Sequence, residues 1–314
     1  MILTRKQTAD FLSQNDNFVI LTHRRPDGDT LGSSAVLCRG LRQLGKNAHI
    51  LRNPEMTEKY AFLHEGLTKV SVEDGEILIA VDTASAGMLP EAFAPYADRI
   101  TLRLDHHETA ESFTELEIVE PKAAACGELV YGILTLMGAE FDKDMANALY
   151  TAISTDTGCF RYANTTPEVL ECAAFCAYRS NELFALNQKL FETVSLSRLR
   201  VQGYLVENAI FLNTGKIALC PLPKSVEEGL GATEDDLDNI SSFPRTIAGV
   251  ELAATLRQEP GRVKISLRAA PGYDAAAICA KFGGGGHKGA AGCSMTCTMD
   301  EAVESLKKAI LEIN

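Results

Sequence analysis

Short apolar runs alternate with amphipathic stretches through the first 185 residues. Apolar runs at 18–22, 48–51, 76–81 and 100–104 have the length of buried strands. An amphipathic first helix precedes them. Helical spacing of apolar residues covers 30–44, 124–138 and 142–154, and a further helix begins at Pro167. This alternation predicts an α/β domain with a mostly parallel, doubly wound sheet and helices on both faces.

The pattern changes after about residue 208. Residues 186–208 have the pattern of one or two linking helices, and two hairpins follow, with turns at Asn213-Thr214-Gly215 and at Pro260-Gly261. A helix at about 274–282, a glycine-rich loop and a last helix from Asp300 end the chain. We therefore expect three parts: a catalytic α/β domain (1–185), a helical linker (186–208) and a smaller mixed α+β domain (209–314).

Composition and charge narrow the class of protein. The chain is 46% hydrophobic and 23% charged, and its apolar runs are far shorter than the roughly 18 residues that span a bilayer. The N-terminus lacks the features of a signal peptide, so we expect a cytoplasmic protein with no membrane partner and reduced cysteines. A net charge of −12 argues against binding long duplex nucleic acid but is compatible with small phosphorylated substrates.

Acidic and imidazole side chains recur where the predicted strands and one helix end. These groups are His23, Asp27 and Asp29 after the first strand, Asp82 and Asp105-His106-His107 after later strands, and Asp156 after a helix. In open α/β sheets, ligands bind at the carboxyl ends of strands, so we expect these groups to converge. A buried cluster of four carboxylates needs counter-charge, and two divalent cations would supply it.

The type of ligand indicates the metal and the chemistry. Mixed imidazole and carboxylate ligation favours Mn²⁺ over Mg²⁺, with Mg²⁺ and Co²⁺ as alternatives. Two neighbouring cations favour in-line phosphoryl displacement, so the pattern predicts a two-metal phosphoesterase. An aspartate after a strand also caps helices, which would explain any single member of the set. Capping does not explain three histidines and several aspartates together.

The order of these motifs resembles the DHH phosphoesterase family. The motifs are H-x-x-P-D-G-D-x-x-G-S (23–33), V-D-T (81–83), D-H-H (105–107) and T-D-T-G (155–158). F-G-G-G-G-H-K-G-A-A-G (282–292) is similar to the C-terminal domain associated with that family. The run from Thr155 to Tyr162, followed by Asn164-Thr165-Thr166-Pro167, is typical of its oligoribonuclease (nano-RNase) and pAp phosphatase branch.

The resemblance assigns roles by position. It implies one metal on His23, Asp27 and Asp82, and a second on Asp29, Asp82, His106 and Asp156, so that Asp82 bridges. It implies that His107 faces the substrate phosphate as a donor or general acid and that Asp105 orients the histidine pair, which makes His107, Asp105 and Asp82 the expected catalytic residues. Arg24 departs from the smaller polar residue frequent in this branch, which leaves its effect on substrate entry open.

The C-terminal domain is interpreted as substrate-binding. The glycines can present backbone N–H groups to an anion, His287 and Lys288 add donors, and Arg268 can bind a phosphate through two hydrogen bonds. The expected residues are Arg268, Gly284, Gly285, Gly286, His287 and Lys288, within a loop that begins at Gly283. Tyr162, Phe160 and Tyr273 are candidates for stacking on a base, or are core residues.

The predicted function is hydrolysis of very short RNA to 5′-mononucleotides, with removal of the 3′-phosphate of pAp as a second activity. Expected partners are short single-stranded RNA, dinucleotides and pAp, and a homodimer stays open. Alternatives are a cyclic or linear dinucleotide phosphodiesterase (c-di-AMP or pApA), a single-strand DNA exonuclease and an inorganic pyrophosphatase. The exonuclease usually carries extra domains, and the pyrophosphatase has a different C-terminal domain. A non-catalytic nucleotide-binding module is the alternative outside enzymes.

Overall fold

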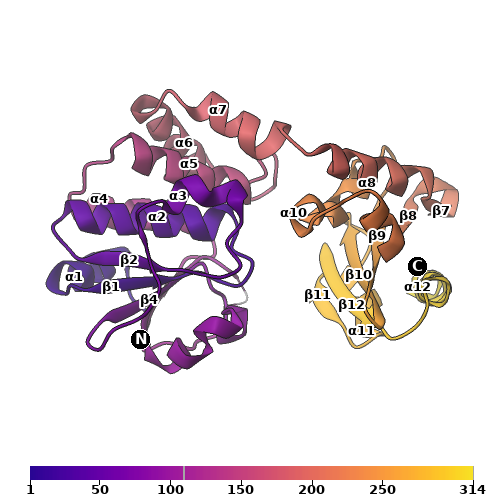
Figure 1. Ribbon diagram of the computed structural model, residues 1–314, viewed down its shortest axis with the longest axis horizontal. Coiled ribbons are helices and arrows are strands. Elements are labelled where there is room, and N and C mark those ends of the chain that lie inside the picture. Colours follow the sequence, from indigo (N-terminus) through magenta and orange to yellow (C-terminus); the bar gives the residue numbers. More distant parts are fainter. Residues whose placement is uncertain (109, 314) are drawn as a thin grey trace. The chain divides into compact units, whose positions relative to one another are not determined.

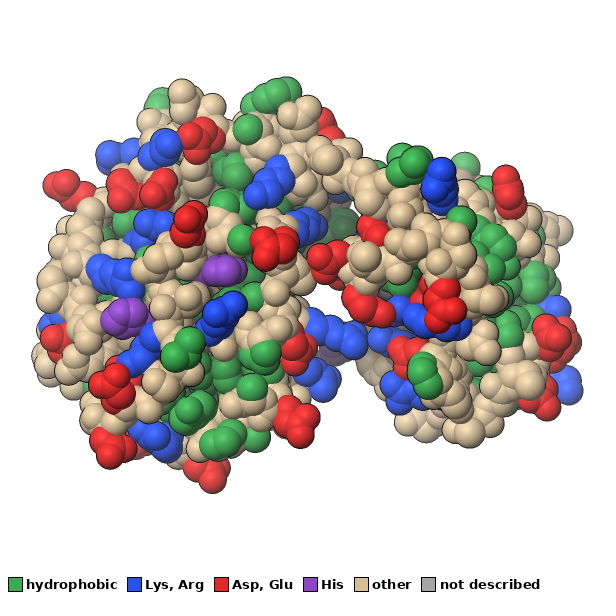
Figure 2. All heavy atoms as spheres, viewed as in Figure 1, with side chains coloured by type: hydrophobic (Ala, Val, Ile, Leu, Met, Phe, Trp, Pro, Cys, Tyr) green, Lys and Arg blue, Asp and Glu red, His purple; other side chains and the backbone are tan. Residues whose placement is uncertain are grey.

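Two compact units make up the chain. The computed structural model describes residues 1–108 and 110–313. Unit 1 is Met1–Thr193 and unit 2 is Val194–Asn314. Figure 1 shows that each unit is built around its own sheet. In Figure 2, acidic and basic side chains intermingle over the visible surface of unit 1. Within the described residues, no helix combines the length and the apolar character needed to cross a bilayer.

Unit 1 contains a six-stranded sheet in the order β3-β2-β1-β4-β5-β6, and every pairing in it is parallel. The strands are β1 (Phe18–Leu21), β2 (Ala48–Leu51), β3 (Thr68–Lys69), β4 (Ile77–Val81), β5 (Ile100–Asp105) and β6 (Leu116–Val119). The parallel α/β prediction is confirmed. Strands β3 and β6 were not predicted, because neither has a long apolar run.

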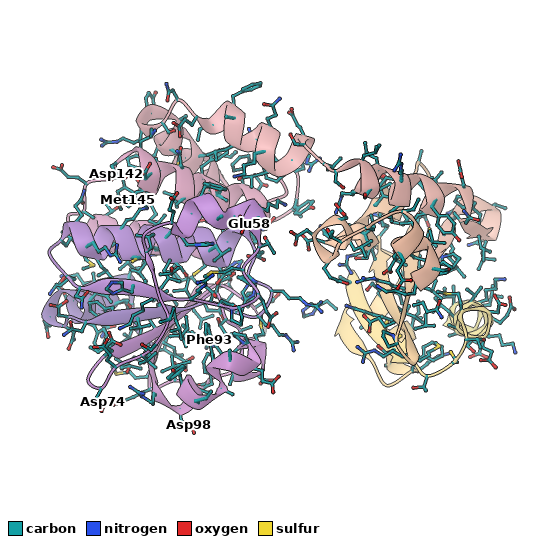
Figure 3. The ribbon with its side chains drawn as sticks, viewed as in Figure 1. Glu58, Asp74, Phe93, Asp98, Asp142 and Met145 are labelled. Atoms are coloured by element: carbon teal, nitrogen blue, oxygen red, sulfur yellow. The ribbon has the colours of Figure 1, made fainter. Side chains whose placement is uncertain are left out.

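Alternate residues of the strands enter two different cores. Phe18 and Ile20 point to the larger core, which the α-helices cover, whereas Val19 and Leu21 point to a smaller core. That second core is closed by the 3₁₀ segment η3 (Glu91–Arg99), whose Phe93 is buried beneath the sheet in Figure 3. The two sheet faces are therefore covered by different kinds of helix.

The helices of unit 1 begin and end largely where the sequence predicts. They are α1 (Arg5–Gln14), α2 (Gly28–Gln43), α3 (Ala61–His64), α4 (Cys126–Leu136), α5 (Lys143–Asp156), α6 (Pro167–Arg179) and α7 (Leu183–Asn187), and the short helices are η1 (Glu58–Tyr60), η2 (Ala86–Met88) and the π-helical η4 (Gln188–Glu192). Side-chain caps fix several starts: the Asp142 carboxylate accepts from the Met145 N–H at 2.8 Å (Figure 3). Pro167 occupies the first turn of α6.

Unit 2 contains a mixed six-stranded sheet in the order β11-β12-β10-β9-β8-β7. Its strands are β7 (Ile210–Leu212), β8 (Ile217–Leu222), β9 (Leu252–Glu259), β10 (Arg262–Ala269), β11 (Gly285–His287) and β12 (Ala290–Met295), and its helices are α8 (Leu196–Glu207), α9 (Lys224–Gly229), α10 (Glu234–Leu237), η5 (Asn213–Gly215), η6 (Ile240–Thr246), α11 (Ala275–Ala280) and α12 (Met299–Ile313). Among the described strands of unit 2, only β8 and β9 pair in parallel, and the other pairings are antiparallel.

The glycine-rich segment was predicted as a loop, and part of it is instead an edge strand. Residues Gly285–His287 pair with β12 in a tight hairpin. The reason is steric. A Cβ on Gly284 would lie 2.2 Å from the Gly292 carbonyl oxygen, and one on Gly286 2.6 Å from that of Ala290. Glycine is therefore required here for close packing of two backbones rather than for a flexible loop.

Candidate metal centre

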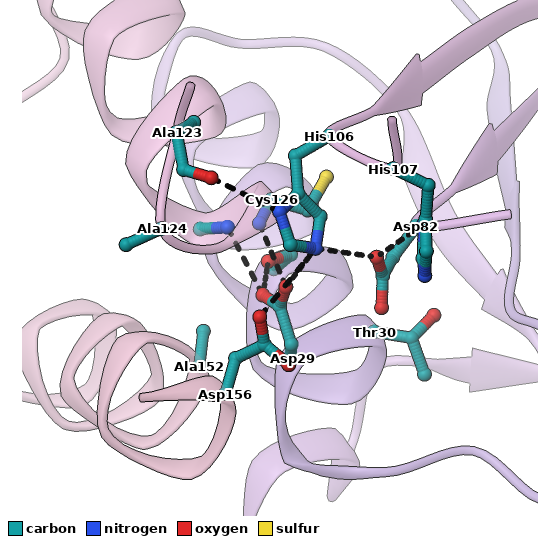
Figure 4. Close-up of polar contacts among 12 residues, drawn as sticks. Asp29, Thr30, Asp82, His106, His107, Ala123, Ala124, Cys126, Ala152 and Asp156 are labelled. Atoms are coloured by element: carbon teal, nitrogen blue, oxygen red, sulfur yellow. Dashed lines mark hydrogen bonds and ion pairs between the residues drawn. The ribbon is translucent and has the colours of Figure 1, made fainter. Parts of the chain in front are cut away.

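Six of the predicted side chains meet at the carboxyl edge of the first sheet. Figure 4 shows Asp29, Asp82, His106 and Asp156 among them. The six side chains come from the β1–α2 loop, the first turn of α2, the ends of β4 and β5, and the last turn of α5. In that order the residues are His23 and Asp27, Asp29, Asp82, His106 and Asp156. Asp156 comes from a helix, so it reaches the site from the layer above the sheet.

The six groups form two clusters. In the first, His23 Nε2 lies 3.7 Å from Asp27 Oδ1 and 3.6 Å from Asp82 Oδ2. In the second, His106 Nε2 lies 3.6 Å from an oxygen of Asp29 and 3.6 Å from one of Asp156. It also lies 3.5 Å from Asp82 Oδ1. The two oxygens of Asp82 therefore face different clusters, which is the geometry of a bridging carboxylate.

These separations suit shared cations better than direct contacts. They exceed hydrogen-bond length, whereas two ligands each about 2.1 Å from one ion lie roughly 3.5 Å apart. Asp82 Oδ1 is buried and accepts no hydrogen bond from any residue in 1–108 or 110–313. An unpaired buried carboxylate oxygen is costly, so the donor set fits divalent cations.

The electrostatics of the two clusters also fit divalent cations. Burial, together with the charges of Asp82 and Asp156, raises the pKa of Asp29 well above its usual range. Burial also raises the pKa of Asp156 to about 6. Burial lowers the pKa of His23, but the nearby carboxylates of Asp27 and Asp82 outweigh that effect and raise it to about 11. Without cations, the site therefore holds excess negative charge that protons partly neutralise.

Backbone carbonyls orient both ligand imidazoles. His23 Nδ1 lies 2.7 Å from the Arg24 carbonyl oxygen, and His106 Nδ1 lies 3.1 Å from that of Ala123. A carbonyl only accepts, so Nδ1 carries a proton in each ring, and Nε2 is the nitrogen that faces the cluster. Asn53 supports this loop by donating from Nδ2 to the His23 carbonyl at 2.9 Å.

His107 has a different environment from its neighbour. Its Nδ1 donates to Asp105 Oδ1 at 2.7 Å, and this hydrogen bond, followed by the charges of Asp82 and Asp105, raises the pKa of His107 to about 8 against the opposing effect of burial. His107 Nδ1 also lies 3.6 Å from Asp82 Oδ1. Asp105 therefore engages Nδ1 and leaves Nε2 as the ring nitrogen outside this hydrogen bond.

A buried arginine lies behind Asp105, and it was not among the residues predicted for the site. Arg103 is 2% exposed, and its Nη1 lies 3.8 Å from Asp105 Oδ2. The guanidinium also pairs with Glu117 and donates to the carbonyls of Ala84 and Glu111 at 3.0 and 2.8 Å. It therefore joins the segments that follow β4 and β5 to strand β6. The one indication in the sequence is that Arg103 lies two residues before Asp105 on the same predicted strand.

Asp27 and Asp29 have structural roles in addition to facing the clusters. Asp27 caps α2 and accepts from the Asp29 and Thr30 N–H groups. Asp29 accepts from the Cys126 and Gly127 N–H groups at the start of α4, at 2.7 and 3.0 Å. Asp29 already lies in the first turn of α2, whereas Asp27 immediately precedes the helix. Capping and ligation are compatible here.

Asp82 has a backbone conformation that is uncommon for a residue other than glycine. Its φ is +57°, in the left-handed region, and its N–H donates to the Leu104 carbonyl at 2.8 Å. Such a conformation costs of order 1 kcal/mol and persists where the surroundings impose it. Here it turns the carboxylate into the cluster at the point where β4 ends.

The predicted substrate-binding residues lie in unit 2. Register pairs Arg268 on β10 with Ala290 on β12, and Ala290 with His287 on β11. Arg268 and His287 therefore project from the same face, about 10 Å apart across two strand spacings. His287 and Lys288 are exposed, whereas the Arg268 guanidinium donates to Ser242 Oγ at 3.3 Å and to the Leu267 carbonyl at 3.1 Å.

The three aromatic candidates differ in exposure. Tyr162 is 51% exposed, and its ring covers Gly158, where a Cβ would lie 2.3 Å from the ring. Phe160 packs against the core of unit 1, and Tyr273 packs against a core of unit 2. Only Tyr162 therefore presents most of a ring to solvent among the three.

Comparisons with known proteins agree with this fold. The model of the DHH family, N-terminal domain, matches residues 17–153, and that of the DHHA1 domain matches residues 216–313. The bifunctional oligoribonuclease and PAP phosphatase NrnA of Thermus thermophilus is 34% identical over 306 residues, which cover 93% of this chain and 89% of the relative.

Two further relatives are informative. The cyclic-di-AMP phosphodiesterase GdpP of Bacillus subtilis is 24% identical over 328 residues, covering 96% of this chain and 49% of the relative. The crystal structure of an exopolyphosphatase-related protein from Bacteroides fragilis has a TM-score of 0.85 and 25% identity, and the match covers 98% of this chain and 96% of that one.

Proposed function

This chain belongs to the DHH phosphoesterase family, and we propose that it hydrolyses short oligoribonucleotides to 5′-mononucleotides and pAp to AMP. The observation that carries the proposal is the pair of clusters that share Asp82, because two adjacent cations are suited to in-line displacement at phosphorus. The oligoribonuclease and PAP phosphatase from Thermus, matched over most of both chains, supports the choice of substrate.

We propose His23, Asp27 and Asp82 for one cation and Asp29, Asp82, His106 and Asp156 for the other. Mn²⁺ is the proposed metal, because the donor set mixes imidazole nitrogen with carboxylate oxygen. When bound, the two cations supply Lewis-acid chemistry: they polarise the phosphoryl group and raise the acidity of the attacking water. The carbonyls of Arg24 and Ala123 keep both imidazoles in the tautomer that ligation needs.

The residues around the clusters then act on the substrate. We propose that His107 Nε2 donates to the phosphate or protonates the leaving ribose oxygen, since Asp105 holds its Nδ1 at 2.7 Å. Arg268, His287, Lys288 and the glycine-rich strand are proposed to bind a second part of the nucleotide. The shared face of Arg268 and His287 supports this role.

A dinucleotide phosphodiesterase is the second candidate function. The match to cyclic-di-AMP phosphodiesterase over 96% of this chain favours it, because the same two clusters can hydrolyse a cyclic or linear diester. The lower identity, 24% against 34%, makes it the weaker proposal.

A product time course tests these proposals. Labelled RNAs of two to seven nucleotides, pAp and c-di-AMP are incubated with Mn²⁺ and with chelator. We expect Mn²⁺-dependent release of 5′-mononucleotides and of AMP from pAp. Faster hydrolysis of c-di-AMP than of all the RNAs would favour the second candidate. Asp82→Ala serves as the inactive control, and Mn²⁺-independent turnover, or no turnover of any substrate, would refute the two-metal proposal.

A further inference from the structure

Two arginines lie within the metal-site loop and belong to neither cluster. Arg24 and Arg25 stand between His23 and Asp27, in the loop that joins β1 to α2, and both are exposed. Sequence analysis left the effect of Arg24 open. The position is distinctive because His23 directly precedes the two arginines and Asp27 follows after Pro26, so both arginines lie between two residues of the first cluster.

The backbone of this loop is fixed by hydrogen bonds. The Arg24 N–H donates to the Met88 carbonyl at 2.7 Å, and its own carbonyl accepts from His23 Nδ1 at 2.7 Å. The Arg25 N–H donates to Glu55 Oε2 at 3.0 Å. The side chains of both arginines therefore extend from a rigid base, which lowers the entropy cost of using them to bind a ligand.

Neither guanidinium is used within the protein. Across residues 1–108 and 110–313, no ion pair, hydrogen bond or ring contact engages either group, although Asp27 follows within three residues. In contrast, Arg103 and Arg257 each bind buried carboxylates. Arg25 has φ +49°, a left-handed conformation that costs of order 1 kcal/mol in a residue other than glycine. A strained, unpaired arginine beside a reactive centre is characteristic of a ligand-binding position.

We propose that Arg24 and Arg25 form a subsite for a second phosphate group of the substrate, separate from the phosphate under attack. The inference rests on the proposed function, whose substrates carry two or more phosphates. A chain with net charge −12 repels such anions, and the cations are occupied by the scissile phosphate. Guanidinium groups bind phosphate oxygens through paired, charge-assisted hydrogen bonds. The subsite would thus select nucleotides that bear an additional phosphate.

The test compares substrates with one and two phosphate groups. Steady-state constants are measured for pAp and for bis-p-nitrophenyl phosphate with Arg24→Ala, Arg25→Ala and the double variant. We expect the KM for pAp to rise about tenfold in each single variant and further in the double one, a rise at least fivefold larger than for the synthetic ester. Arg24→Lys and Arg25→Lys should recover part of the loss. Arg200→Ala, which removes an exposed arginine of α8, is the matched control.

Equal changes in KM for both substrates, or a loss of kcat alone, would overturn the subsite and assign the arginines to the shape of the loop. Calorimetric affinity for pAp and for AMP is measured in parallel, with Ca²⁺ replacing Mn²⁺ to suppress turnover. If wild-type protein hydrolyses neither ester, the proposed function fails. In that case, the subsite proposal is supported if the variants lose the higher affinity for pAp than for AMP. It is refuted if the ratio of the two affinities is unchanged.

Discussion

At the scale of single residues, the site depends on side chains that perform two tasks each. Asp27 caps α2 and faces the first cluster, and Asp29 anchors the start of α4 and faces the second. Their types and positions were predictable from the chain, because a strand end followed by a helix places polar groups at a sheet edge. The anchoring of α4 by Asp29 was not predictable, since its partners Cys126 and Gly127 lie about 100 residues away, whereas the capping of α2 by Asp27 is local.

The proton balance of the metal-free site gives a pH-dependent prediction. Burial raises the pKa of Asp156 to about 6, whereas in the unfolded chain it is about 4. The folded protein therefore binds this proton more tightly, so its stability falls as pH rises from about 4 to about 6. Above pH 6, the loss of folding stability that comes from ionised Asp156 stays at its full value.

Asp156→Asn should remove this fall. Melting temperatures are measured in chelator between pH 4 and 7 for wild type and variant. We expect the melting temperature of the variant to rise relative to that of wild type as pH increases across that interval. At pH 7, excess Mn²⁺ should raise the melting temperature of the wild-type protein more than that of the variant. Parallel curves for the two proteins would show that Asp156 ionises normally in the folded state.

The buried Arg103 leads to a prediction about stability. Arg103→Met leaves Glu117 buried without its counter-charge, whereas Asp105 keeps His107, and breaking a buried pair on one side costs about 3–5 kcal/mol. Urea unfolding measures the loss. Adding Glu117→Gln to the variant should recover part of it, because one uncompensated charge is removed. A loss below about 1 kcal/mol would mean that Arg103 contributes little beyond its packing against Phe113.

At the scale of elements, the close packing of α2 on α5 brings Asp29 and Asp156 together. Strands, helices and the sheet edge could be predicted because hydrophobic periodicity and caps are local signals. The approach of α2 to α5 could not be predicted, because it depends on which glycines meet which backbone atoms. The same limit explains the edge strand at Gly285–His287, where the glycines meet the backbone of β12.

Gly32→Ala tests this packing. Alanine normally favours a helix over glycine, yet a Cβ on Gly32 would lie 2.6 Å from the Ala148 carbonyl oxygen and 3.0 Å from Ala152. Because backbone atoms cannot move aside as a flexible side chain can, α2 must shift. We expect a loss of about 1–3 kcal/mol in unfolding free energy and weaker Mn²⁺ binding by calorimetry.

Gly203→Ala in α8 is the matched control for that experiment. No heavy atom lies within 4 Å of a Cβ built at Gly203 in the described structure. The substitution should therefore stabilise the protein by about 0.5–1 kcal/mol. Similar effects of the two substitutions would show that space between α2 and α5 does not limit the site.

At the scale of the whole molecule, the residues proposed for metal binding and those proposed for substrate binding lie in two units with separate cores. Unit 1 holds the clusters, and unit 2 holds the row of Arg268 and His287. The overall charge of −12 then acts on any polyanionic substrate in addition to local contacts. Local positive groups can hold a few phosphates, but each further phosphate of a longer chain adds repulsion without a partner.

Substrate length and salt should therefore act together. We expect kcat/KM at low ionic strength to fall at least tenfold between a three-nucleotide RNA and a 24-nucleotide RNA. Raising salt from about 20 to 200 mM shortens the screening length from roughly 20 Å to below 10 Å, so it should weaken repulsion of the distant phosphates and narrow that gap. The short RNA should instead bind more weakly in salt, since its contacts are attractive. A gap that does not change with salt would mean that steric exclusion, rather than the charge of the chain, limits substrate length.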